Sequence, residues 1–189
     1  MSITRRTALK QAFIIAGGSL FLPACAHHTD KSTALALHHL WLPDGQQDTL
    51  EALADTLLPA GTSPTDKTLG AKATGAHLFA LRMMDDCFPE KEQQQYLRGL
   101  LAFDQLAQKQ YGKSFTSCDQ TQRNTLVANL DASAFAKNAP EDDLHAFYRT
   151  NKRLVIRGYL GSQYFLTKIE VYELVPGRWH GCVPVTKKS

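Results

Sequence analysis

The feature that most constrains the fold is a long amphipathic segment between Glu90 and Tyr111. Its apolar side chains recur every three or four residues, which places them on one broad face of an α-helix. Gly112 follows as a helix stop. At 1.5 Å per residue this helix would be roughly 33 Å long, so the rest of the chain must cover its apolar face. The apolar residues are Tyr96, Leu97, Leu100, Leu101, Phe103 and Leu106.

Shorter helical segments lie on both sides of this one. A helix is predicted from Asp48, where Asp48 and Glu51 form a capping-box pattern, to a stop at Pro59. Asp119 and Gln122 form a second capping box, followed by a short helix with inward-facing leucines. Two further helices are predicted over residues 71–87 and 141–157.

The pattern predicts an all-α fold, a small irregular helical bundle with an extended C-terminal tail. Residues 162–172 suit a helix or a strand. We expect a signal peptide over residues 1–24, a tether over 25–47 and a helical domain over 48–189. That domain includes a candidate docking tail at 174–189.

Arg5 and Arg6 precede an apolar stretch that runs from Ala12 to Leu22. An arginine pair in this position is typical of a twin-arginine export signal. The stretch is shorter than the roughly 20 residues that a helix needs to span a bilayer, so it predicts a targeting peptide. An ordinary secretory signal with an incidental arginine pair is the alternative. The twin-arginine route carries folded proteins, commonly after a cofactor has been inserted.

The end of the signal allows two kinds of processing. Leu22-Pro23-Ala24-Cys25 resembles a lipobox, in which Cys25 is acylated and becomes the first mature residue. Ala24-Cys25-Ala26 also fits the small-x-small site of ordinary signal peptidase, which would release a chain beginning at His27. In either case we expect a periplasmic protein, and acylation would make it a membrane-associated lipoprotein.

The positive charge of the chain belongs to its signal. Three of the 21 basic residues lie in residues 1–24, and the remaining 18 equal the 18 acidic residues in number. A neutral body gives no electrostatic reason to expect nucleic-acid binding. The chain from Leu144 onward contains eight basic residues and two acidic ones. This excess of positive charge suits pairing within the fold, an acidic partner surface or anionic lipid.

Four cysteines are present in the exported chain or at its boundary: Cys25, Cys87, Cys118 and Cys182. Cys87 and Cys118 flank opposite ends of the long predicted helix, which places them too far apart for a disulfide. We expect Cys118 to be a core thiol. If Cys25 is acylated, an odd number remains, which points to a free thiol or a bond to another chain. Cys182 is the candidate for that bond.

Motifs that bind cofactors or build active sites are absent from the sequence. It has no glycine-rich dinucleotide fingerprint, P-loop, nucleophile elbow or HExxH, and no haem or iron–sulfur cysteine spacing. The pairs His27-His28 and His38-His39 could bind a transition metal, but adjacent histidines rarely converge on one ion, which favours a linker. We therefore predict no catalytic residue, no cofactor and no metal site in this chain.

Two features fit a binding role. A basic stripe would run along the helix over 141–157, with a merely solvated face as the alternative. In the tail, a Pro-Gly turn is followed by Arg178 and Trp179, residue types that are enriched in interface hot spots. The tail could instead fold back onto its own domain. The stripe consists of Arg149, Lys152, Arg153 and Arg157.

Several short motifs follow one another in a distinctive order. They are Leu57-Leu58-Pro59, Gly70-Ala71, Gly99-Leu100, Arg157-Gly158-Tyr159, Ser162, Tyr172 and the stretch from Val175-Pro176-Gly177 to Gly181-Cys182. In this order, and behind a twin-arginine signal, they resemble the subunit 3 family of gluconate 2-dehydrogenase-type enzymes. The resemblance covers about residues 48–184.

The resemblance implies a non-catalytic partner of a large flavoprotein of the glucose-methanol-choline type. In the family that flavoprotein holds FAD, oxidises a sugar or sugar acid, and often passes electrons to a multihaem cytochrome c. Any FAD, haem c or iron–sulfur centre would thus belong to partner subunits. The small subunit supports maturation of the flavoprotein and supplies the signal that the twin-arginine translocase reads for both. A disulfide between subunits is known in the wider family, and Cys182 is the candidate by position.

The sequence also fits a second class of function. A stand-alone periplasmic lipoprotein that binds a metal or scaffolds an envelope complex would also carry an export signal and no cofactor motif. Tight metal binding through the histidine pairs would favour that class.

Overall fold

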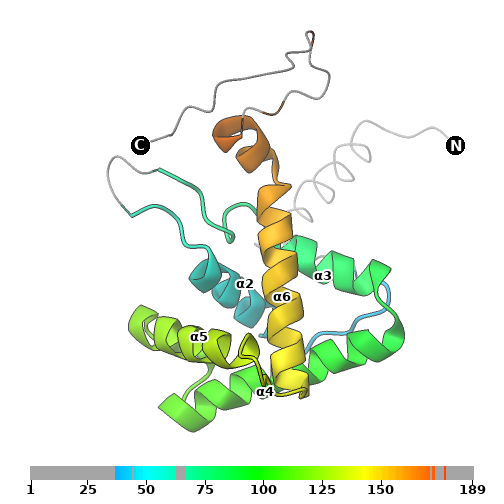
Figure 1. Ribbon diagram of the computed structural model, residues 1–189, viewed down its shortest axis with the longest axis vertical. Coiled ribbons are helices and arrows are strands. Elements are labelled where there is room, and N and C mark those ends of the chain that lie inside the picture. The colour runs from blue at the N-terminus through cyan, green and yellow to red at the C-terminus, as the bar shows by residue number, and fades with distance from the viewer. Residues whose placement is uncertain (1–36, 44, 63–66, 171, 173–176, 178–189) are drawn as a thin grey trace, which may run out of the picture. The chain divides into compact units, whose positions relative to one another are not determined.

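Helix α6 crosses most of the other helices and holds them together (Figure 1). In this computed structural model it packs most extensively against α4 and α3, and it also contacts α5 and α2. A 3₁₀ turn, η1, contacts α2 and α4, and a π-helical turn, η2, follows α6. The elements are α2 (Gln46–Leu57), α3 (Ala76–Cys87), α4 (Glu90–Tyr111), η1 (Phe115–Ser117), α5 (Gln120–Ala134), α6 (Asp143–Leu160) and η2 (Phe165–Ile169).

The structure describes residues 37–43, 45–62, 67–170, 172 and 177. All of them belong to a unit that begins at Leu37. Every regular element in these ranges is helical, which confirms the predicted all-α fold. The predicted signal peptide, and the tail apart from residue 177, lie outside the described residues.

Aromatic side chains form the centre of the core. Tyr96 of α4 meets Phe147 of α6 edge to face, with ring centroids 4.8 Å apart. Phe103 lies 4.7 Å from Phe115 and 6.1 Å from Phe147, so the cluster joins α4, η1 and α6. All four rings are at most 2% exposed. Large buried rings contribute much of the apolar area that stabilises a core, and edge-to-face pairs add about 1 kcal/mol each.

Two buried tyrosine hydroxyls fix α6 in rotation as well as in position. Tyr96 donates to Asn151 Oδ1 at 2.7 Å, and Tyr148 donates to Asp131 Oδ1 at 2.9 Å. Burial raises the pKa of both tyrosines, so both hydroxyls stay protonated and act as donors. These bonds tie α6 to α4 and to α5.

Glycines allow α6 to approach its neighbours closely. A Cβ on Gly99 of α4 would lie 2.2 Å from the Asp143 carbonyl oxygen and 2.3 Å from Phe147 Cβ. On the other side, a Cβ on Gly158 of α6 would lie 2.7 Å from the Phe79 ring of α3. The crossing of α4 and α6 is therefore set by the backbone, because no side chain fits at Gly99.

The capping prediction was correct for one helix and wrong for another. Asp119 accepts from the Gln122 backbone N–H at 2.9 Å, and Gln122 accepts in return, as the capping box at the start of α5 requires. The predicted box of Asp48 and Glu51 does not form, because α2 begins earlier, at Gln46. Its N-cap is Gly45, which has a φ of +82° and no side chain to serve as a cap.

The boundaries of two other helices also differ from the prediction. The segment from Ala71 forms turns until Gly75, whose φ of +70° breaks the helical path, and α3 begins at Ala76. Helix α6 begins at Asp143, because Asp142 is its cap and accepts from the His145 N–H at 2.8 Å. The predicted long helix α4 is confirmed over Glu90–Tyr111, including its stop at Gly112.

The predicted apolar face of α4 is too broad at one edge. Tyr96, Leu100 and Phe103 are buried, but Leu101 is 47% exposed. After α6, the segment that suited either a helix or a strand forms the π-helical turn η2. Backbone N–H groups of Glu170 and Tyr172 close this turn onto the chain before it.

The contact at Gly99 can be tested by substitution. We expect Gly99→Ala to lower the free energy of unfolding by about 3 kcal/mol, because the new methyl group would overlap backbone that cannot move without separating α4 from α6. Urea denaturation measures this. Gln105→Ala, on an exposed position of the same helix, is the control and should change stability by less than about 0.5 kcal/mol. A Gly99→Ala protein as stable as wild type would disprove the close approach.

Candidate partner-binding surface

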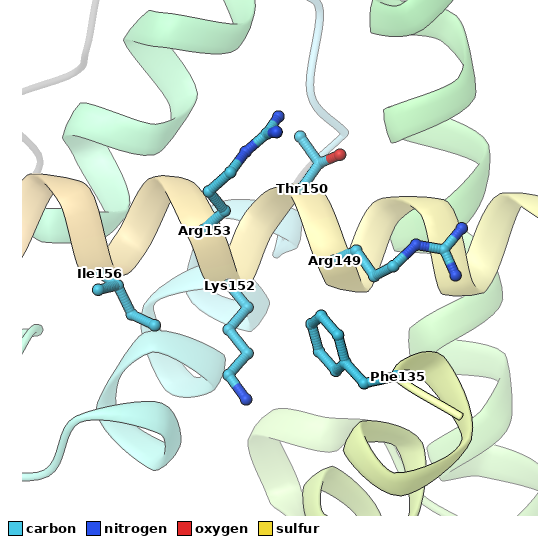
Figure 2. A pocket seen from close by; sticks show the side chains of 6 residues that line it. All are labelled: Phe135, Arg149, Thr150, Lys152, Arg153 and Ile156. Atoms are coloured by element: carbon cyan, nitrogen blue, oxygen red, sulfur yellow. The ribbon is translucent and has the colours of Figure 1, made fainter. Parts of the chain in front are cut away.

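A groove of about 560 Å³ runs along the outer side of α6 (Figure 2). Five of its residues come from α6, and the sixth, Phe135, is the first residue after α5. Figure 2 shows the Phe135 ring beside α6, between the side chains of Lys152 and Arg149. The lining residues are Phe135, Arg149, Thr150, Lys152, Arg153 and Ile156.

Phe135 is unusually exposed for an aromatic residue. The residue is 57% exposed. Its ring lies edge to face with the Tyr148 ring, and the two ring centroids are 6.5 Å apart. The Lys152 ammonium lies 5.1 Å above the ring centroid, in a cation–π arrangement. No sequence motif or helical period singles out Phe135. Its one available signal was a large apolar residue in an otherwise small and polar stretch.

The three cations of the groove differ in their partners. Lys152 forms an ion pair with Asp131. Arg149 donates to the carbonyl oxygens of Ala134 and Pro140 at 3.3 and 3.4 Å. Arg153 is exposed and forms no ion pair or hydrogen bond with the part of the chain that the structure describes. The guanidinium of Arg153 is therefore available to another molecule.

The Asp131 carboxylate is held by its own domain through Oδ1, which accepts from both Lys152 and Tyr148. Burial tends to raise the pKa of its carboxyl, but the hydrogen bonds from Lys152 and Tyr148 outweigh this and lower the pKa. The carboxylate is therefore ionised at neutral pH, and its negative charge balances the positive charge of Lys152. No acidic residue lines the groove, so its net character is basic.

The structure divides the predicted basic stripe. Arg149, Lys152 and Arg153 all line the groove, and Figure 2 shows Arg153 directed to the opposite side of α6 from Lys152. Arg157 lies one turn further along and does not line the groove. The other candidate residues lie outside the described residues. They are Arg5 and Arg6 in the signal, Cys25 at the processing site, and Arg178, Trp179 and Cys182 in the tail.

A second polar site fixes the segment that leads into the domain. The Asp85 side chain at the end of α3 accepts the backbone N–H groups of His38 at 2.6 Å, His39 at 2.8 Å and Leu40 at 2.6 Å. Gln93 of α4 supports this site by donating to the carbonyl oxygens of Asp85 and Phe88. We call these contacts the Asp85 clasp. Residues 37–43 belong to the predicted tether, but the clasp and the burial of Leu40 hold them against the helices.

The charge of Asp85 is maintained by the clasp. Asp85 is 2% exposed, and burial tends to raise the pKa of its carboxyl. The three donated N–H groups outweigh burial and lower the pKa. Asp85 is therefore a buried, ionised carboxylate whose partners all lie in the chain itself.

The same site is the only group of acidic and histidine ligands within the described ranges that approaches metal-binding geometry. His38, Asp85 and Asp86 can each offer one ligand atom, and these atoms lie within 4.8 Å of one another. However, Asp85 already accepts three N–H groups, and His38 Nδ1 lies 3.0 Å from Asp86 Oδ1. The arrangement fits a structural clasp better than an ion site.

The two cysteines that the structure describes are both free. Cys118 is 5% exposed, and burial raises the pKa of its thiol, which confirms the predicted core thiol. Cys87 is exposed, and the two do not form a disulfide, as the sequence predicts. Cys25 and Cys182 lie outside the described residues.

The far end of α6 holds the loop between α2 and α3. Tyr159 donates to the Leu69 carbonyl at 3.0 Å, and the Leu69 N–H donates to the Tyr164 hydroxyl at 3.1 Å. Next to this contact, a Cβ on Gly70 would lie 2.5 Å from Ala60 N. The two tyrosines and the glycine thus fix the end of this loop at Leu69 and Gly70.

The described part of the chain is a helical domain with one exposed basic groove and a polar clasp that serves its own fold. Residues 44–177 match the family described as gluconate 2-dehydrogenase subunit 3. Because the match covers well over half of the 189 residues, the chain belongs to that family. No curated protein and no solved structure matches it. Among the helices that the structure describes, none is both long and apolar enough to cross a membrane.

Four residues of the short motifs that resemble the family have structural roles in the described part of the chain. Gly70, Gly99 and Gly158 each lie where a Cβ would meet another segment at less than 3.0 Å. Tyr159, which follows Gly158, holds the loop at Leu69. These four residues therefore shape the fold.

We expect Asp85→Asn to lower the free energy of unfolding by about 3 kcal/mol. The amide would lack the charge that three buried N–H groups solvate, and its own NH₂ would face donors. Chemical denaturation at neutral pH measures this. Asp86→Asn, a neighbouring carboxylate with a side chain that is 39% exposed, is the matched control and should cost much less.

The stability of the wild-type protein and that of Asp85→Asn should depend differently on pH. The folded pKa of Asp85 lies below its unfolded value of about 3.9, so the contribution of the carboxylate is fully present above that value. It is lost as the pH falls through the folded pKa. The stability gap between wild type and Asp85→Asn should therefore narrow in acid. A gap that stays constant down to about pH 2 would contradict the assignment of the ionised carboxylate to the clasp.

Proposed function

We propose that this chain is the non-catalytic small subunit of a periplasmic, FAD-dependent dehydrogenase that oxidises a sugar or sugar acid. The observation that carries the proposal is the family match over residues 44–177, because the family is described as a subunit of gluconate 2-dehydrogenase. The catalytic subunit would be a large flavoprotein of the glucose-methanol-choline type. FAD would reside there, and a multihaem cytochrome c or an iron–sulfur centre would take up the electrons.

The polar chemistry of the described residues supports an accessory role. Asp85, Asp131 and Asp142 have lowered pKa values, the usual sign of carboxylates with strong partners. Each is engaged by groups of its own domain, namely backbone N–H groups, Lys152 with Tyr148, and His145 respectively. A general acid or base must instead face a substrate. These carboxylates therefore act on the fold.

The export signal gives the subunit its second role. Arg5 and Arg6 would direct the chain to the twin-arginine translocase, which carries folded cargo. A flavoprotein needs its FAD before export, so a small subunit bound to it in the cytoplasm could support its maturation and carry it across. The mature complex would lie in the periplasm, attached to the membrane through a partner or through a lipid on Cys25.

Replacement of the arginine pair tests the export role. In the native host, Arg5→Lys with Arg6→Lys should leave both this chain and the flavoprotein in the cytoplasm, because the charge is kept but the arginine pair is lost. Flavin absorbance and sugar-dependent dye reduction in the periplasmic fraction measure the result. Lys10→Arg is the control and should leave export unchanged.

Two outcomes would contradict the proposal. Export of active flavoprotein by the double lysine variant would show that this chain does not carry it. Export of wild-type chain alone, with no flavoprotein in any fraction bound to it, would favour the alternative of a stand-alone envelope lipoprotein that binds a metal or acts as a scaffold.

A further inference from the structure

We propose that the groove along α6 binds an acidic segment of the dehydrogenase subunit, with apolar side chains of that segment seated against Phe135 and against Ile156. This inference rests on the proposed function, since it names the surface by which the small subunit holds its partner.

The charge of the groove calls for carboxylates. Arg149, Lys152 and Arg153 line it and no acidic residue does. The carboxylates nearby are engaged, because Asp131 accepts from Lys152 and Tyr148. Asp142 accepts from both the backbone N–H and Nδ1 of His145, at 2.8 and 2.7 Å. Arg149 is attracted electrostatically to the Asp142 carboxylate, but among the described residues neither Arg149 nor Arg153 forms an ion pair or a hydrogen bond with a carboxylate. A guanidinium matches a carboxylate in a two-pronged contact.

The apolar floor calls for a side chain to cover it. Phe135 is 57% exposed, and Ile156 is partly exposed on the other side of the Lys152 side chain (Figure 2). Burying an aromatic ring removes a large apolar area from water and is a common anchor of protein interfaces. A groove of about 560 Å³ accommodates a few side chains. It would be the anchor of a larger interface, because stable interfaces bury about 1,600 Å² in total.

The tail of the chain itself fits this groove poorly. Residues 178–189 contain three basic residues, Arg178, Lys187 and Lys188, and no acidic side chain. Their charge has the same sign as that of the groove, so the two would repel each other.

An anionic membrane also fits it poorly. A helix that binds a membrane surface buries its whole apolar face in the lipid. The apolar face of α6 is already in the core, where Phe147, Tyr148 and Val155 are at most 1% exposed. What remains outside is a concave site with a small apolar floor, which suits a protein segment.

Charge reversal at one residue separates the groove from the rest of α6. In complexes purified with the full-length flavoprotein, Arg153→Glu should weaken binding at least tenfold, and Phe135→Ala should weaken it by a similar factor. Arg157→Glu makes the same charge change at an exposed position one turn further along the helix, outside the groove, and should bind within about twofold of wild type. All three variants should keep the melting temperature of wild type within a few degrees, because both arginines are exposed and Phe135 is largely so.

A chemical crosslink tests the acidity of the partner segment directly. Arg153→Lys places a primary amine in the groove, and a water-soluble carbodiimide joins such an amine to a nearby carboxylate as an amide. Mass spectrometry should find Lys at this position joined to an Asp or Glu of the flavoprotein. The matched Arg157→Lys variant should give no such crosslink.

Several results would overturn the inference, and they can be told apart. If the wild-type complex forms but Arg153→Glu and Phe135→Ala bind as well as Arg157→Glu, the groove is not the site and the proposed function stands. If instead Arg153→Glu loses only its binding to phosphatidylglycerol vesicles, the groove binds lipid. If wild type forms no complex with a flavoprotein, the proposed function and this inference fail together.

Discussion

The backbone contact between α4 and α6 at Gly99 is the constraint on which the rest of the structure depends. Without a Cβ at this position, the start of α6 lies directly on α4, with the Asp143 carbonyl and Phe147 Cβ against the glycine. That approach brings Phe147 to within 4.8 Å of the Tyr96 ring and lets the Tyr96 hydroxyl reach Asn151. The rotation of α6 about its own axis is fixed as a consequence.

The rotation of α6 decides which of its residues face outward. With Phe147, Tyr148 and Val155 turned into the core, Arg149, Arg153 and Ile156 must lie on the other side. The groove is therefore a by-product of core packing, completed by Phe135 at the end of α5. One helix thus supplies both the centre of the fold and the surface that we assign to the partner, which couples correct folding to a competent docking surface.

The sequence predicted those features that depend on neighbours in the chain. The apolar period of α4, its stop at Gly112 and the capping box of Asp119 all arise within a few residues. The starts of α2 and α3 were missed because Gly45 and Gly75 begin these helices through a left-handed backbone, which leaves no polar capping residue to recognise. The Asp85 clasp was missed for a different reason. Its donors lie 45 to 47 residues away along the chain, and only the fold brings them together.

The groove, too, has features that follow from neighbours in the chain and features that only the fold determines. Helical spacing placed Arg149 and Arg153 on one stripe, and the structure places both in the groove. Spacing could not show that Lys152 is taken up by Asp131 or that Arg157 lies beyond the groove, because both facts depend on α5 and on where it ends. Phe135 was missed because its importance comes from its exposure, which a sequence does not display.

The most direct test of the central claim is a purification of the C-terminally tagged chain from the envelope of its native host, without reductant. The account predicts that a large flavoprotein is recovered with it in equal amount, seen as flavin absorbance that elutes with the tag and as a matching mass in native mass spectrometry. A chain that is recovered alone and without flavin absorbance would contradict the account.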